Sequence, residues 1–402
     1  MTIKLKKFKD LISKNGLFSD GNWIESKDQN PDGSVRLIQL ADIGVGKFID
    51  KSNRFMTEER ANDLNCTYLV EGDILVARMP DPIGRACIFP QVQQKCVTVV
   101  DICIIRPDSD QIDTRWLMHL INSKHFNNQV LQYVTGTTRQ RISRGNLAKL
   151  DVEVPPLDEQ KRIAEILDKA DTIRRKRQQA IQLADDFLRS VFLDMFGDPV
   201  TNPKGWQVEL LGEHIRHANN GLSRRRKVEE NIGDIVLRLQ DVHYEGIRFG
   251  KELNRVDLED KEKSRYRLDI GDLLFIRVNG NPEYVGRSAV FEGFNEAVFH
   301  NDHLIRIKVK DSFNSRFLSY MLNLPGGKKI ISSKTKTSAG QHTISQGGIE
   351  SLEFIIPPID LQNKFVEIQS KVKMQLTRQS VSFNELTHSF DSLSQKAFAG
   401  EL

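Results

Sequence analysis

The stretch Pro155-Pro156-Leu157-Asp158-Glu159-Gln160 opens the segment that decides the fold of this chain. A run without glycine or proline follows it and ends at Met195-Phe196-Gly197-Asp198-Pro199. Proline and aspartate are typical of helix N-termini, and glycine followed by proline is typical of a helix C-terminus. Apolar residues recur in the run mostly three or four positions apart. The run therefore predicts one helix, roughly 55 Å long, with a continuous apolar stripe that needs a partner.

The chain contains a second copy of this signal. Pro357–Gln362 lies 202 positions after the first copy. Further upstream, Gly72–Arg78 is repeated as Gly271–Arg277, which lies 199 positions later. Gly286 again lies 202 positions after Gly84, so the second copy carries an insertion between these two motifs. So many matches in the same order identify a tandem duplication of about 200 residues.

Each copy has the same internal order. Short apolar runs read as strands, one or two short helices such as Thr114–Asn122 and Ser315–Asn323 interrupt them, and a long helix closes the copy. The sequence thus predicts an α+β protein with two tandem-repeated α/β domains, each followed by a long helix. The predicted segments are residues 1–154 (first domain), 155–198 (central helix), 199–356 (second domain) and 357–402 (C-terminal helix).

The two long helices match each other. Their apolar stripes have polar interruptions at Arg177 and Gln379, again 202 positions apart and near mid-length. We expect an antiparallel coiled coil with pseudo-twofold symmetry, in which the helices cross near these two residues. The alternative is that each helix packs only on its own domain. Besides the two polar residues, the predicted pairing positions are Ile163, Leu167, Leu188, Phe365, Leu376 and Leu386.

Composition sets broad bounds. The 402 residues are 39% hydrophobic and 28% charged, with a net charge of +4, which is ordinary for a soluble protein of two or three domains. The four cysteines (Cys66, Cys87, Cys96 and Cys103) form no closely spaced pair, so we expect reduced thiols and no metal site. No apolar run reaches the roughly 18 residues of a membrane span. These features favour a cytoplasmic protein that does not contact a membrane.

A search for catalytic motifs finds none. Pro325–Lys329 lacks the spacing of a phosphate-binding loop. His300 and His303 could ligate a metal, but their place in a predicted strand favours a structural role. Asn281–Tyr284 is close to the Asn-Pro-Pro-Tyr with which amino-methyltransferases hold a flipped adenine, yet its third residue is Glu, and we interpret it as a turn. We therefore expect no catalytic residue.

Polar, basic loops stand out instead. Thr135–Arg141 and Lys334–Thr343 occupy equivalent positions in the two copies, and Leu222–Lys227 adds a run of positive charge. Glycine permits close approach of the backbone, while Thr, Lys, Arg and Gln suit phosphate oxygens and base edges. The alternative for any such run is a solvated loop. The candidate DNA-binding residues are Thr137, Thr138, Arg139, Gln140, Arg141, Lys334, Lys336, Gln341, His342, Arg224, Arg225, Arg226, Arg78 and Arg277.

Taken together, these residues resemble the specificity subunit of type I restriction-modification systems. The resemblance rests on the duplicated halves, the GD(I/L)L…R segment, the loop that leads through Ile-Ser to (V/I)PP(L/I)xxQ, and long helices ending in Phe-Gly-Asp-Pro and Ala-Phe-Ala-Gly-Glu-Leu. It implies two target recognition domains that read the two halves of a bipartite site in double-stranded DNA. The helices would be spacers that set the distance between the half-sites.

The resemblance also implies partners and no catalysis by this chain. Modification subunits would methylate adenine with S-adenosylmethionine, and restriction subunits would translocate and cut DNA with ATP and Mg²⁺, so these cofactors would belong to the partners. Two other readings remain. The chain could be a fused methyltransferase or nuclease with its own recognition domains, or a coiled-coil scaffold whose globular domains bind protein.

Overall fold

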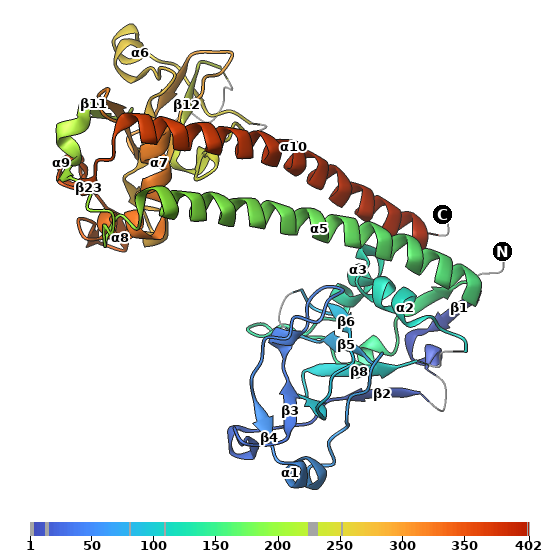
Figure 1. Cartoon of the computed structure of the whole chain (residues 1–402). Coiled ribbons are helices and arrows are strands. Elements are labelled where there is room, and N and C mark those ends of the chain that lie inside the picture. Colours follow the sequence, from blue (N-terminus) through green and yellow to red (C-terminus); the bar gives the residue numbers. More distant parts are fainter. Residues whose placement is uncertain are drawn as a thin grey trace. The chain divides into compact units, whose positions relative to one another are not determined.

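The computed structural model describes residues 4–12, 16–79, 82–107, 110–223, 232–250, 252–399 and 401, apart from the side chains of 377–388 (Figure 1). The chain divides into two compact units. Unit 1 comprises Met1–Gln179 with Ser380–Leu402, and unit 2 comprises Ala180–Gln379. Both unit boundaries fall inside the long helices, close to Arg177 and Gln379.

Unit 1 is built on small sheets. β1 (Lys4–Lys7) pairs with β9 (Asp151–Val154). A four-stranded antiparallel sheet has the order β2 (Leu17–Asp20), β8 (Ile102–Arg106), β5 (Ile74–Ala77), β6 (Ala86–Ile88). A three-stranded sheet has the order β4 (Phe55–Met56), β3 (Val35–Ile38), β7 (Cys96–Thr98), with β3 and β7 parallel. The short helices are α1 (Glu58–Asp63), α2 (Thr114–Ile121), α3 (Lys124–Gln132) and α4 (Arg144–Leu147).

Unit 2 repeats this plan, as the duplication predicts. β10 (Val208–Leu210) pairs with β23 (Glu353–Ile355). The four-stranded order is β11 (Ile215–Asn220), β20 (Leu304–Val309), β16 (Leu273–Ile276), β18 (Ser288–Val290). The three-stranded order is β15 (Arg255–Val256), β12 (Asp234–Leu237), β19 (Val298–His300), with β12 and β19 parallel. The short helices are α6 (Asp260–Tyr266), α7 (Ser315–Asn323), α8 (Pro325–Ser332) and α9 (Gln346–Glu350).

Unit 2 also has short strands where unit 1 has isolated antiparallel bridges between equivalent residues, Ile43 with Phe48 and Thr135 with Arg141. β13 (Val242–His243) and β14 (Gly246–Ile247) form a hairpin. A second small sheet has the order β17 (Val278–Asn279), β22 (Gln341–Thr343), β21 (Lys336–Ser338). β17 lies in the insertion that the sequence comparison located, so the insertion changes the local architecture.

The predicted long helices are present as α5 (Leu157–Phe196, green) and α10 (Ile359–Phe398, red), of 40 residues each (Figure 1). Each is shared between the units. In unit 1, Ala397 and Phe398 from the end of α10 share a core with Ile163 and Leu167 from the start of α5. The two segments run antiparallel there, because the beginning of one helix packs with the end of the other.

Unit 2 contains the complementary arrangement. Phe192 and Phe196 from the end of α5 are fully buried, and Phe192 packs edge-on against Phe365 from the start of α10, with ring centroids 5.4 Å apart. Leu188 is buried and Leu376 is half-buried. The idea that each helix packs only on its own domain is therefore wrong. The side chains of Gln379 and Leu386 lie outside those the structure describes.

The repeated PPxxxQ motif closes each unit through its glutamine. Gln160 is 1% exposed, accepts a hydrogen bond from the Asp113 N–H at 2.9 Å, and donates to the Gln111 and Pro155 carbonyls. Gln362 makes the same bonds in unit 2, accepting from the Asn314 N–H at 2.9 Å. Since buried backbone groups must be paired, this glutamine fixes the start of each long helix to the turn before α2 or α7.

The repeated Gly-Asp motif forms a tight turn before a core strand. Gly72 and Gly271 have φ of 89° and 94°, a conformation that favours glycine. The following aspartates accept backbone hydrogen bonds at 2.9 Å, Asp73 from Val70 and Asp272 from Asp269. Within the residues that the structure describes, no helix has the length and apolar character needed to cross a bilayer.

Candidate nucleic-acid interface

In unit 1, the predicted binding loop is a short exposed connection between α3 and α4. Thr135 and Arg141 exchange two backbone hydrogen bonds of 3.0 and 2.9 Å, which close the loop at its base. Gly136 has φ of 99°, and a Cβ there would lie 2.5 Å from the Arg139 carbonyl oxygen. The five candidate residues 137–141 are all exposed. The loop therefore presents Thr, Arg and Gln side chains to solvent on a narrow stem.

In unit 2, the equivalent segment is a β-hairpin rather than the loop that the sequence predicts. β21 and β22 pair through Lys336–Thr343 and Ser338–Gln341, and Ala339 and Gly340 at the turn have positive φ of 47° and 74°. Positive φ at both central residues is typical of a type I′ hairpin turn. The strand that sequence analysis missed is β17, whose Val278 pairs with Thr343 and thereby braces the hairpin.

Most candidate side chains of this hairpin point outward. Lys334, Lys336 and Gln341 are exposed. His342 is half-buried, and its Nδ1 lies 2.9 Å from the Thr337 hydroxyl. The candidates Arg224, Arg225 and Arg226 lie outside the residues that the structure describes.

The two remaining candidates, Arg78 and Arg277, support the loops from inside. Their carbonyl oxygens accept the N–H of Ile142 at 3.2 Å and of Ile344 at 2.9 Å, the buried residues that follow each loop. Arg78 is only 8% exposed, and its guanidinium lies 3.3 Å from Asp20 and also donates to the Val100 carbonyl. DNA contact by these arginines stays a prediction, whereas the observed geometry is that of residues that position a loop.

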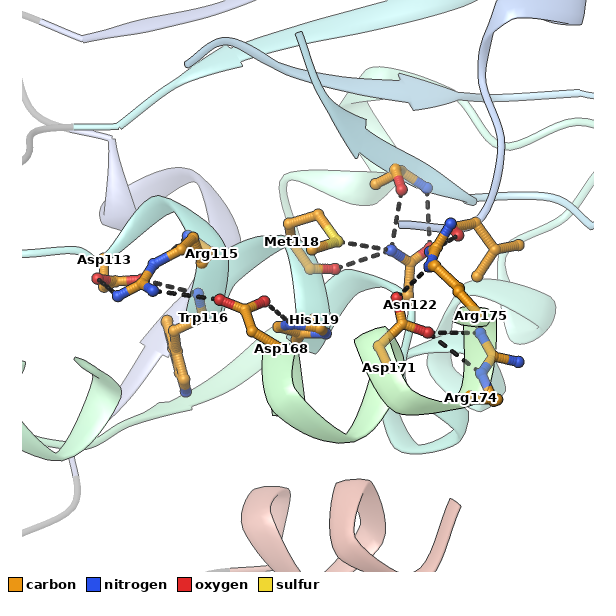
Figure 2. Close-up of polar contacts among 12 residues, drawn as sticks. Asp113, Arg115, Trp116, Met118, His119, Asn122, Asp168, Asp171, Arg174 and Arg175 are labelled. Atoms are coloured by element: carbon orange, nitrogen blue, oxygen red, sulfur yellow. Dashed lines mark hydrogen bonds and ion pairs between the residues drawn. The ribbon is translucent and has the colours of Figure 1, made fainter. Parts of the chain in front are cut away.

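A polar cluster that the sequence did not reveal fixes the first half of α5 to α2 in unit 1 (Figure 2). His119 Nε2 lies 2.7 Å from Asp168 Oδ1, and Arg115 lies 3.2 Å from the other carboxylate oxygen. Burial raises the pKa of Asp168, but the hydrogen bonds and charges of His119 and Arg115 lower it by more. The pKa of Asp168 therefore lies below its usual range. About two turns later in α5, Arg175 donates to the Val45 carbonyl at 3.0 Å. In the sequence, the signal that could have revealed this cluster is the pair of acidic residues Asp168 and Asp171 within the predicted helix.

Of the two histidines considered for metal binding, His300 has a structural role, whereas His303 is exposed. His300 is fully buried, and its Nδ1 lies 3.0 Å from the Tyr266 carbonyl. Within the described part of the chain, no three His, Cys, Asp or Glu side chains gather as a metal site would require. All four cysteines are buried and free, and burial raises the pKa of Cys87 to about 12 and that of Cys96 to about 11. Thiols with such pKa values stay protonated and unreactive near neutral pH.

His300 makes unit 2 sensitive to acid. Burial lowers its pKa to about 4, so an unfolded chain, with a histidine pKa of about 6.5, binds more protons between these values. The contribution of neutral His300 to stability is therefore complete above pH 6.5 or so and is lost as the pH falls toward about 4. We expect the stability difference between the protein and a His300→Gln variant to shrink by up to about 1.4 kcal/mol per pH unit in this window. Urea unfolding at several pH values measures it, and a constant difference would contradict the expectation.

Comparison with known proteins identifies the family. The model of the family described as "Type I restriction modification DNA specificity domain" matches residues 3–183 and again residues 203–382. The chain belongs to this family. The two matches coincide with the two copies of the duplication. They favour a specificity protein over a fused methyltransferase or nuclease.

Individual relatives agree with this assignment. The StySPI specificity subunit of Salmonella potsdam is 30% identical over 321 residues, covering 74% of this chain and 67% of the relative. The EcoKI specificity subunit of Escherichia coli K12 is 25% identical over 322 residues, covering 74% of this chain and 68% of the relative. Among solved structures, the type I restriction-modification S subunit from M. genitalium has a TM-score of 0.60 at 16% identity, covering 99% of this chain and 96% of that chain. This likeness extends the shared fold over almost the whole chain.

Proposed function

We propose that each unit of this specificity-family protein reads one half of a bipartite site in double-stranded DNA. Residues 1–154 and 199–356 are the recognition domains, and the helical segments 155–198 and 357–402 set the spacing and bind the other subunits. The observation that carries the proposal is the exposed polar loop at one position of both units, fixed at its base by a buried isoleucine bonded to an arginine carbonyl. Two similar domains that each expose a polar loop at the same position fit a DNA target with two half-sites.

The proposal assigns catalysis to other subunits. Modification subunits would supply adenine methylation with S-adenosylmethionine, and a restriction subunit would supply ATP-driven translocation and cleavage. The complex would work in the cytoplasm, where chromosomal DNA is accessible. The test is sequencing of modified adenines in host DNA with the chain present and after its deletion. Loss of one bipartite methylation motif on deletion is expected, and an unchanged set of motifs would contradict the proposal.

Exposed loop residues should affect one half-site each. Arg139→Ala should relax base preference in the half read by unit 1, and Gln341→Ala in the half read by unit 2, by about 1–3 kcal/mol of discrimination. Lys334→Ala should instead weaken binding to all sequences evenly, because a lysine on a phosphate carries no base information. The same modified-adenine sequencing measures these effects. Unchanged motifs in the first two variants would refute the residue assignments without affecting the family membership.

A further inference from the structure

Unit 2 has a pocket of about 580 Å³ beside its hairpin, and the proposed function does not account for this pocket. Three elements line it: the turn of the insertion, helix α8, and the hairpin. Lys328 and Lys329 come from α8, Glu283 comes from the insertion, and Thr337 and His342 come from the hairpin. The pocket therefore brings two lysines close to Thr337 and His342 of the hairpin that is proposed to read DNA.

The charge of this pocket is positive. Glu283 is the acidic residue of its lining, and it lies 3.7 Å from Lys328 with 73% of its side chain exposed, so it neutralises at most one lysine. Lys329 is exposed. Lys334, in the turn that leads from α8 to the hairpin, and Lys336, on the hairpin, are exposed and add to the positive field. An anion is the ligand that such a lining favours.

The hairpin offers a hydrogen-bond donor as well as charge. His342 Nδ1 and the Thr337 hydroxyl lie 2.9 Å apart and share one hydrogen. If the hydroxyl donates to Nδ1, neutral His342 carries its single N–H hydrogen on Nε2, and if Nδ1 donates, the hydroxyl hydrogen is left over. In either tautomer one polar hydrogen of the pair remains for a ligand. Lysine ammonium groups and such donors are the groups that hold phosphate oxygens.

The lysine pair is specific to unit 2. Asn122 and Asn323 mark equivalent positions, because each amide exchanges hydrogen bonds with the backbone of one strand residue, Ala86 at 2.9 Å and Ser288 at 2.8 Å. Counted from these asparagines, Lys328 and Lys329 correspond to Asn127 and Asn128 in α3. The insertion that supplies the pocket's wall is likewise a feature of the second copy. The two units thus present different charge next to similarly placed loops.

We propose that this pocket binds a backbone phosphate of the DNA whose bases the hairpin reads, which makes unit 2 the stronger electrostatic anchor. The inference rests on the proposed function and adds to it a phosphate-binding site. The hairpin lines the pocket with Thr337 and His342 while it exposes Lys336 and Gln341, so DNA on the hairpin brings its backbone to the pocket. The phosphate contact fixes the register of the duplex, and the hairpin tip reads it.

The test is the salt dependence of binding between the full-length chain and a fluorescent duplex of random sequence, followed by anisotropy. The variant Lys328→Ala/Lys329→Ala should bind more weakly at low salt, and its slope of log K against log salt should be smaller by about 0.9 for each lost phosphate contact. Glu283→Gln should bind more tightly than the natural protein, because it frees Lys328. Lys261→Ala/Lys263→Ala, which removes two lysines of α6 in the same unit and outside the pocket lining, is the matched control and should keep the slope.

Failure of the phosphate-binding pocket can be told apart from failure of the proposed function. An unchanged slope in the double-lysine variant overturns the pocket, while the methylation test still decides the proposed function. An equal loss in Lys261→Ala/Lys263→Ala also overturns it, because the effect would then be one of total charge. If inorganic phosphate binds the protein and the lysine variant abolishes that binding without any change in the DNA slope, the pocket belongs to a small anion and the DNA proposal is refuted. An unchanged set of methylation motifs after deletion of the chain would instead refute the function and leave the measured slopes as they are.

Discussion

Replacement of Phe192 by alanine is expected to lower the free energy of unfolding of unit 2 by about 3–5 kcal/mol. The ring is fully buried, and its centroid lies 5.0 Å from that of Phe196, 5.7 Å from Phe317 and 5.4 Å from Phe365. These neighbours come from α5, α7 and α10, so the cavity left by the ring would open where three helices meet. Urea or thermal unfolding of the full-length chain measures the loss.

Phe187 provides the matched control on the same helix. Its side chain is 52% exposed, so Phe187→Ala removes the same atoms from a place where little burial is lost. We expect a change within about 0.5 kcal/mol, as for surface substitutions in general. Equal effects of the two variants would show that the end of α5 does not belong to the core of unit 2.

Shortening both long helices by the same amount is expected to change the spacing that the protein accepts between its half-sites. Deleting residues 177–183 from α5 and 379–385 from α10 removes roughly two turns, about 10 Å, from each. The apolar stripe returns to nearly the same face after about seven residues, with a drift of roughly 20°. If the helices set the spacing, the accepted gap should shrink by about three base pairs at 3.4 Å per step. Sequencing of modified adenines reads both the gap and the half-sites.

The half-sites themselves should remain unchanged, because the recognition domains are left intact. A deletion in α5 alone is the control, and it should abolish methylation rather than shift the gap, since the helix ends would no longer meet their partners in both units. Altered base preference with an unaltered gap would disprove the role of the helices as spacers.

The motifs that reveal the family are mainly structural ones. Gly72 turns the chain at positive φ, and Gln160 satisfies two backbone groups before α2 and one before α5, so the observed role of each is structural. Their roles depend on a fixed local geometry, which explains why a short pattern can identify them. The residues proposed to read DNA, by contrast, lie on exposed loops, where packing places no demand on residue type.

The amino-acid sequence was sufficient to predict the duplication, the two long helices with their ends, and the order of elements in each copy. Those features follow from local patterns: apolar residues at helical or strand spacing, helix caps, and glycine where φ is positive. Three features became visible only in the folded structure. Phe192 packs in the core of unit 2, whereas Phe398 packs in the core of unit 1. The second loop is a hairpin that β17 braces, and Asp168 binds a side chain of α2. An apolar stripe requires a partner without naming it, and a strand as short as Val278–Asn279 exists only because Thr343 pairs with it.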